Sequence, residues 1–253
     1  MLTIKGNSGI GDSVYVRVIC EHIPEITEVM SDYPEVFEGL PVNVIPHKSN
    51  KPANFMRVSY CGDKYRTDTT QWQDIARKAG LQPVPPLTSK WDTKEILSTA
   101  RPPFCVVIKP YIPMQRNDGF GDDLEIDIEN IDEAIKELKN KYYIIQCGKG
   151  YKNYNNAEID YSDKLSLKEY INLLAVADLV ISQPGNALPI LEAFGRGKGV
   201  FVFTKKGERS SSRFIKAINY NKIVEKKDRI TWCYDSDSPN IILEKISGIM
   251  EKG

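Results

Sequence analysis

The chain has 253 residues, of which 41% are hydrophobic and 27% charged, so it has enough apolar material for one large or two small folded domains. Its 34 basic and 34 acidic side chains give a net charge of zero, which argues against a protein that coats nucleic acid with its whole surface. The mean hydropathy is −0.37 and no apolar run reaches roughly 18 residues, so no transmembrane helix is predicted.

The amino-terminal part of the sequence predicts strands that alternate with helices. A glycine-containing turn at residues 6–11 separates the first strand from the first helix, which Pro24 ends, and Gly80 closes the second helix. The Pro-rich residues 82–86 and the prolines at 102–103 bracket a predicted domain boundary. The predicted elements are a strand at 2–5, a helix up to residue 23, strands at 42–45 and 56–60, and a helix at 72–79.

The carboxyl-terminal part predicts a clearer alternation of strands and helices. Apolar residues recur there at helical spacing between short, continuously apolar runs. The predicted elements are strands at 104–109, 142–147, 179–182 and 199–204, and helices at 131–138, 170–177, 189–194 and 242–250. Such an alternation favours an α/β fold with parallel sheets covered on both faces. We therefore expect two such domains, at residues 1–100 and 101–253, with a cleft between them.

The cysteines and histidines exclude several kinds of site. Five scattered cysteines contain no CxxC pair, so a zinc site or a disulfide framework is not expected, and the cysteines within apolar runs read as buried free thiols. This pattern fits a reducing cytoplasm, and the first residues lack the layout of a signal peptide. With only two histidines in the chain, we expect carboxylate chemistry and no metal site.

The first candidate motif is Gly9-Ile10-Gly11-Asp12, which follows the first predicted strand. A glycine-containing turn at the start of a helix lets backbone amides approach an anion. The motif is not GxGxxG, because residue 14 is Val, and no P-loop lysine follows, so a dinucleotide-binding fingerprint is poorly supported. Asp12 has two interpretations: the N-cap of the helix, or a general base at the mouth of the cleft.

The second candidate motif runs from Ser182 to Gly197 and joins a predicted strand to a loop and a helix. The carboxyl ends of parallel strands are where open α/β sheets bind ligands. Asn186 and the nearby backbone amides are candidates to contact a diphosphate. Glu192, inside the helix, is a candidate to accept two hydrogen bonds from a ribose diol, and the alternative is a solvated carboxylate on the helix surface.

Charged residues are unevenly distributed in the carboxyl-terminal part. Eight acidic residues lie between residues 118 and 133 with no Lys or Arg among them, whereas residues 205–229 carry nine basic and three acidic side chains. The simplest interpretation is two solvated faces of opposite sign. The alternative is a phosphate-facing patch around Lys205, Lys206, Arg209 and Arg213, with hydroxyl donors from the serines at 210–212.

Gly11-Asp12 and the segment of residues 163–182 together carry a family resemblance. Gly11-Asp12 after a first strand resembles the amino-terminal Gly-Asp motif of glycosyltransferase family 9, the heptosyltransferase-like enzymes. Residues 177–181, Ala-Asp-Leu-Val-Ile before a glycine loop, look like that family's carboxyl-domain pattern. The family's Asp-Ser/Thr-Gly triplet is replaced by residues 183–185, Gln-Pro-Gly, and its loop histidine is missing. Glu192 instead resembles the ribose-binding Glu of other GT-B enzymes.

The resemblance implies the GT-B architecture, in which two Rossmann-like parallel-sheet domains face a central cleft. It also implies inverting, metal-independent transfer of a sugar from a nucleotide-diphosphate donor, with Asp12 as the base and no cofactor besides the donor. Together with the charge pattern, it leads us to expect the donor to be contacted by Gly11, Arg116, Gly185, Asn186, Ala187, Leu188, Glu192, Lys205 and Lys206.

The sequence leaves more than one acceptor and more than one reaction open. The acceptor is a sugar, a lipid-linked sugar or a hydroxylated base in DNA, since phage DNA glycosyltransferases also adopt GT-B folds; the basic residues 205–229 would then meet phosphates. A different class of protein would hydrolyse, epimerise or only bind a nucleotide sugar, because a fold alone does not fix a function.

Overall fold

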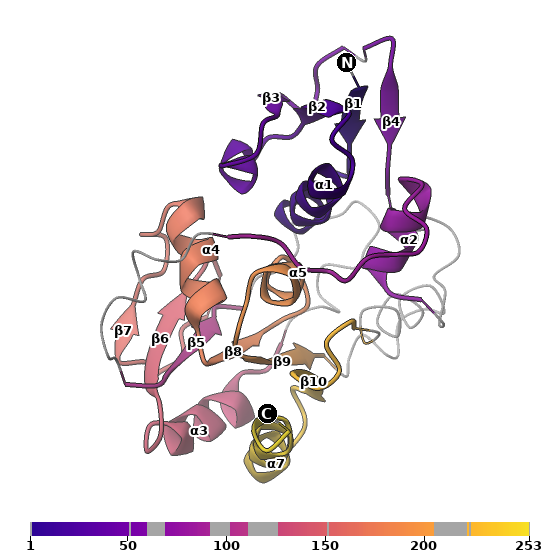
Figure 1. Ribbon diagram of the computed structural model, residues 1–253. Helices are drawn as coiled ribbons and strands as arrows, with labels where there is room; N and C mark the ends of the chain where they lie inside the picture. The colour runs from indigo at the N-terminus through magenta and orange to yellow at the C-terminus, as the bar shows by residue number, and fades with distance from the viewer. Residues whose placement is uncertain are drawn as a thin grey trace.

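A computed structural model of the chain describes residues 2–50, 52–59, 69–91, 102–110, 126–150, 152–204, 222 and 224–252. The described residues form two α/β domains, each built on a parallel sheet, with the amino-terminal domain above the carboxyl-terminal domain in Figure 1. The predicted fold class, two Rossmann-like parallel-sheet domains, is therefore confirmed.

The first domain has a sheet with the strand order β3-β2-β1-β4, and all its strand pairs are parallel. Its main helix packs against the sheet through Val14 and Val18, which are fully buried in the same cluster as Ile4. The elements are β1 (Leu2–Lys5), α1 (Ile10–His22), β2 (Ile26–Met30), the short 3-10 helix η1 (Pro34–Phe37), β3 (Asn43–Ile45), β4 (Phe55–Arg57) and α2 (Gln71–Lys78).

The second domain has a larger sheet with the strand order β10-β9-β8-β5-β6-β7, again with only parallel pairs. The elements are β5 (Phe104–Ile108), α3 (Glu129–Leu138), β6 (Tyr143–Cys147), β7 (Ile159–Asp160), α4 (Leu167–Val176), β8 (Leu179–Ser182), α5 (Ala187–Ala193), β9 (Lys198–Phe203), β10 (Ile230–Tyr234) and α7 (Pro239–Met250).

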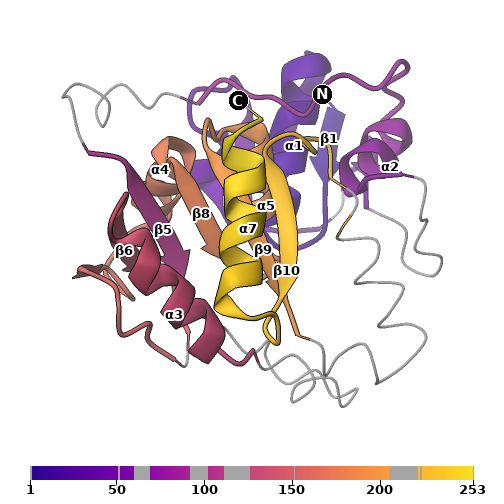
Figure 2. The ribbon, with the colours of Figure 1, turned by 90° about the horizontal axis from the view of Figure 1, so that it is seen from below.

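Helices cover both faces of the second sheet. Seen from below, α3 and α7 lie side by side across one face (Figure 2). Along β5, Cys105 and Val107 belong to the apolar cluster under these two helices, whereas Val106 and Ile108 belong to the cluster on the side of α4 and α5. This alternation explains why β5 is buried along its whole length and why its sequence is continuously apolar.

The apolar core is continuous across the domain boundary. Helix α1 of the first domain packs against α5 of the second, and buried residues of both helices belong to one cluster. Residues 82–91 cross this interface: the backbone N–H of Ser89 donates to the carbonyl of Ala193 at 3.0 Å, and Trp91 stacks on Phe194. Residues 92–101 lie outside the described part, so the boundary expected after residue 100 stays a prediction.

Three strands were missing from the sequence-based prediction: β2, β7 and β10. In β2, Glu28 faces a buried environment, where its carboxylate accepts a hydrogen bond from the Thr3 hydroxyl at 2.9 Å. The cysteine prediction is confirmed for Cys20, Cys105, Cys147 and Cys233, which are free and buried, whereas Cys61 lies outside the described residues.

Candidate functional site

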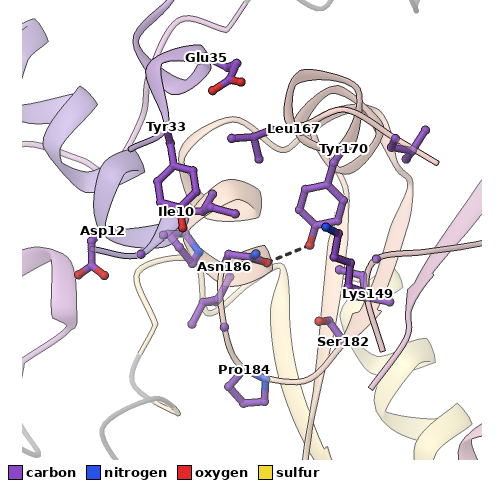
Figure 3. Close-up of a pocket in the computed structure, with 18 of the residues that line it drawn as sticks. Ile10, Asp12, Tyr33, Glu35, Lys149, Leu167, Tyr170, Ser182, Pro184 and Asn186 are labelled. Atoms are coloured by element: carbon purple, nitrogen blue, oxygen red, sulfur yellow. Dashed lines mark hydrogen bonds between the residues drawn. The ribbon is translucent and has the colours of Figure 1, made fainter. Parts of the chain in front are cut away.

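A cavity of about 820 Å³ lies between the two domains. The first domain lines it with the start of α1 and with the loop that follows β2. The second domain lines it with the end of β5, with the loops that follow β6, β7 and β8, and with α4. The carboxyl ends of both parallel sheets therefore meet at this cavity, which is where ligands bind in open α/β folds. Its volume falls within the range typical of sites for small-molecule ligands. In Figure 3, Tyr33 of the first domain and Tyr170 of the second lie on opposite sides of it.

Asp12 lies in this cavity, on the first turn of α1. One carboxylate oxygen accepts a hydrogen bond from Asn7 Nδ2 at 3.1 Å. Burial raises the pKa of Asp12, and hydrogen bonds from the Asn7 side chain and the Gly9 backbone oppose that rise. The N-cap of α1 is Gly9, and Asp12 is the third residue of the helix, so the N-cap interpretation of Asp12 is wrong. A carboxylate with a raised pKa at a cavity wall is suited to accept a proton.

The loop after β8 lies next to Asp12's helix. Gly185, Asn186 and Leu188 line the cavity, and the Asn186 side-chain oxygen accepts a hydrogen bond from the Tyr170 hydroxyl at 2.9 Å (Figure 3). A Cβ atom on Gly11 would lie 3.5 Å from the Asn186 Cα and 2.8 Å from the Pro189 ring, so the close approach of the two domains requires glycine there. The structure thus brings together Gly11, Asp12, Gly185, Asn186 and Leu188, whereas Ala187 and Glu192 of the second motif are buried and do not line the cavity.

Glu192 lies elsewhere in the same interdomain region. Its side chain is only 4% exposed, so the alternative of a solvated surface carboxylate is wrong. Its Oε1 accepts hydrogen bonds from the backbone N–H groups of Glu225 at 2.6 Å and Lys226 at 3.4 Å. Burial raises the pKa of Glu192 to about 7, against the effect of these two bonds. Glu192 does not line the cavity, and its expected contact with a ribose stays a prediction.

Lys149 is a cavity residue that the sequence-based reasoning missed. It lies in the Gly-Lys-Gly turn after β6, and Figure 3 places it on the same side of the cavity as Tyr170. The sequence signal was limited to a glycine turn after the predicted strand at 142–147, and only the strand order of the sheet shows that this turn lies beside the end of β5. The remaining charged residues that line the cavity are carboxylates: Asp12, Asp32, Glu35 and Asp163. Among the described lining residues, Lys149 is therefore the only Lys or Arg available to an anionic ligand.

The other predicted cationic contacts lie outside the described residues. This applies to Arg116, Lys205 and Lys206, and to the patch with Arg209, Arg213 and the serines at 210–212. Their roles as phosphate contacts stay predictions.

The described residues contain no group of three or more His, Cys, Asp or Glu side chains arranged to hold a metal ion. Asp235 and Asp237, two carboxylates two residues apart, have protein partners: Asp235 Oδ2 accepts the backbone N–H of Asp127 at 3.3 Å, and Asp237 pairs with Lys245 at 2.7 Å. A membrane-spanning helix is likewise not found in the described part of the chain, where every helix is too short or too polar.

No protein-family model matches the sequence, and no curated protein matches it significantly. Solved structures do match the fold. The ADP-heptose LPS heptosyltransferase II of E. coli is similar at a TM-score of 0.62 and 14% identity, over 99% of this chain and 98% of that one. A family 9 glycosyltransferase from Veillonella parvula is similar at a TM-score of 0.64 and 7% identity, over 99% and 97% of the two chains.

A third solved structure is the heptosyltransferase TibC in complex with ADP-D-β-D-heptose, at a TM-score of 0.56 and 17% identity. The match covers 80% of this chain and 58% of that one. All three are similar to this chain in overall fold, at TM-scores above 0.5. The chain therefore has the two-domain GT-B fold of the heptosyltransferase-like glycosyltransferases of family 9.

Proposed function

We propose that the protein is a glycosyltransferase that moves a sugar from a nucleotide-diphosphate donor to an acceptor hydroxyl. The observation that supports this most is the position of Asp12. Its carboxyl, with a raised pKa, lines a cavity across which the Gly185–Asn186 loop of the other domain also lies. This combines a candidate base with a candidate donor loop in a fold that known glycosyltransferases share.

In the proposed reaction, the donor binds on the side of the second domain and the acceptor on the side of the first. Asp12 accepts the proton of the acceptor hydroxyl while the hydroxyl oxygen attacks the anomeric carbon. The bond between that carbon and the diphosphate oxygen breaks at the same time, so the nucleoside diphosphate leaves and the anomeric configuration inverts. Holding both substrates in one cavity supplies part of the rate enhancement, about several kcal/mol.

Lys149 is proposed to offset the negative charge that develops on the departing diphosphate, assisted by backbone amides of the Gly185–Asn186 loop. With this cation in place, we propose that transfer needs no metal ion. Turnover should then persist in EDTA, and loss of turnover in EDTA with recovery on adding manganese would refute this part of the proposal.

A DNA acceptor is not favoured by the described part of the cavity. Four carboxylates line it, and they would repel the phosphates of a nucleic-acid strand. The proposal therefore concerns an acceptor that places a hydroxyl, and not a polyanionic backbone, beside Asp12.

The test is a thermal-shift panel of nucleoside diphosphates and their sugars. A ligand that binds only the folded state, at about 100 times its Kd, stabilises that state by about 2.7 kcal/mol and raises Tm by several degrees. At least one nucleoside diphosphate should do so, and its nucleoside alone should have a much smaller effect. If no member of the panel raises Tm, the proposed function is wrong.

A pair of lysine variants tests whether the nucleoside diphosphate binds in this cavity. Lys149 and Lys141 lie at opposite ends of β6, and only Lys149 lines the cavity. Lys149→Met should weaken binding of the nucleoside diphosphate about tenfold, the scale of one charge-assisted hydrogen bond. The exposed Lys141→Met is the matched control and should bind as the wild type does. Equal affinity in both variants would remove Lys149 from the donor site.

A further inference from the structure

A second, smaller cavity of about 230 Å³ opens at the carboxyl edge of the first sheet. The first half of the loop between β1 and α1 lines this cavity with Gly6, Asn7 and Ser8, while the second half lines the large cavity. The two cavities therefore flank the same loop. The remaining lining residues are Lys5, His47, Phe55 and Arg57, and we refer to the whole as the basic cavity.

The charges that line the basic cavity all have the same sign. Lys5 and Arg57 are register partners on the neighbouring strands β1 and β4, so their side chains emerge on the same face of the sheet. No acidic residue lines the cavity, and within the described part of the chain no carboxylate forms an ion pair with either side chain. Arg57 is exposed, so its guanidinium is accessible to a ligand.

Hydrogen bonds hold the wall of the basic cavity in place. Lys5 Nζ donates to the His47 carbonyl at 2.5 Å, and the His47 backbone N–H donates to Asp32 Oδ1 at 3.0 Å. The His47 ring lies with Nε2 3.3 Å from the Gly6 carbonyl, so a hydrogen bond there requires a proton on Nε2. These contacts fix the Lys5 side chain and the imidazole around one space before any ligand enters, and the exposed Arg57 borders that space.

One side chain separates the basic cavity from Asp12. Asn7 lines the basic cavity and donates its side-chain N–H to Asp12 Oδ1 at 3.1 Å. A molecule with an anionic group in the basic cavity would therefore extend along the Gly6–Gly11 loop toward the proposed base.

We propose that the basic cavity binds a phosphate or carboxylate group of the acceptor and so places the acceptor hydroxyl at Asp12. This assignment rests on the proposed glycosyltransferase function for its orientation, but not for the binding of the anion itself. Guanidinium and ammonium groups recognise phosphate and carboxylate through charge-assisted hydrogen bonds, and Asn7 and Ser8 add uncharged donors. The predicted substrate class is an acceptor with one anionic group close to the hydroxyl that is glycosylated.

The test is an NMR titration that follows the two histidine rings of the chain. His47 lines the basic cavity, whereas His22 lies at the end of α1 and lines a different cavity between α1 and α4, so a shift of His47 without a shift of His22 places the anion in the basic cavity. The probes are inorganic phosphate and acetate, each compared with chloride at the same ionic strength. We expect a saturable shift of the His47 resonances alone, with a Kd of about 1–10 mM for the preferred anion. The stronger of the two probes identifies the anionic group as phosphate or carboxylate.

Two substitutions locate the bound anion. Arg57→Gln should weaken binding of the preferred probe about tenfold, since it removes a charge-assisted hydrogen bond from an exposed position that the fold does not need. Lys48→Gln, also exposed and next to His47 but outside the cavity lining, is the matched control and should leave the affinity unchanged. Unchanged His22 resonances would show that both variants are folded.

The proposal is overturned if neither probe shifts His47 saturably, or if Arg57→Gln and wild type bind equally well. Both outcomes are independent of the glycosyltransferase proposal, because the titration needs neither donor nor turnover. Conversely, anion binding at His47 without any response to nucleoside diphosphates would leave the basic cavity as an anion site and refute the proposed transfer reaction.

Discussion

Replacing Asp12 by Asn removes the proposed base and changes little else. Asn has nearly the same size, and its side-chain oxygen can still accept the 3.1 Å hydrogen bond from Asn7. Asp12 is the third residue of α1 and not its N-cap, and the Asn oxygen can also accept the hydrogen bond that the backbone N–H of Gly9, at the helix start, donates to Asp12. Asp12→Asn should therefore keep the fold and lose proton transfer.

The size of the effect follows from the role of the residue. A positioned general base contributes about 10²–10⁴-fold, so kcat of Asp12→Asn should fall by that factor. Stability should not fall with it. Because burial raises the pKa of Asp12 in the folded protein, ionisation of Asp12 costs stability at neutral pH, and Asn removes that charge. Donor affinity should stay close to that of the wild type, since the proposed donor contacts belong to the other domain.

The assay is release of nucleoside diphosphate during sugar transfer, measured from pH 4 upward at about half-unit steps. In the wild type, kcat/KM should fall at low pH through a pKa above the ordinary Asp value of about 3.9. The pH profile of Asp12→Asn should lack this fall. Asp228→Asn, an exposed carboxylate that does not line the cavity, is the matched control. Near-normal turnover of folded Asp12→Asn would refute the catalytic role of Asp12.

The remaining predictions concern the packing between the domains and the buried Glu192. Gly11→Ala should lower the free energy of unfolding in urea by about 1–3 kcal/mol, because the new Cβ lies 2.8 Å from the Pro189 ring. The control is Gly248→Ala, whose new Cβ has nothing within 4 Å and which should stabilise the protein by about 0.5–1 kcal/mol. Equal effects of the two substitutions would contradict the close approach of the domains at Gly11. Arg17→Met should cost about 3–5 kcal/mol, since the 3% exposed guanidinium donates to four acceptors, and a loss below about 1 kcal/mol would show that these bonds contribute little. Because the pKa of Glu192 is raised in the folded state, the folded protein binds this proton more tightly than the unfolded chain, and its contribution to stability should decrease as pH rises from about 4.5 to about 7. Glu192→Gln should reduce that decrease. An unchanged pH dependence of the urea midpoint in this variant would refute the raised pKa.

Local patterns were sufficient to predict most of the fold. Strands β5 and β8 lie where continuous apolar runs predict them, and helices α3 and α4 follow apolar residues at helical spacing. The two glycine-containing loops follow strands directly, and the ends of parallel strands lie at one edge of a sheet. The sequence therefore also predicts that both loops reach one cleft, and Gly11 and Asn186 do meet there.

What the sequence could not predict depends on contacts between distant segments. Strand β2 carries Glu28, which reads as exposed until the Thr3 hydroxyl and the neighbouring strands bury it. Glu192 reads as a surface carboxylate or a ligand contact, whereas the backbone around Glu225 covers it. Lys149 is one of many lysines, and only the order of strands in the second sheet places it in the cavity.

The proposed reaction is sugar transfer between two substrates held in one cavity. The most direct measurement incubates the protein with the nucleotide sugar that gives the largest thermal shift and with a pool of anionic and neutral sugar acceptors, and follows the products by mass spectrometry. A glycosyltransferase yields an acceptor heavier by one sugar residue and releases an equimolar amount of nucleoside diphosphate, and both products should be lost in Asp12→Asn. Release of free sugar in place of a glycosylated acceptor would show a hydrolase and refute sugar transfer.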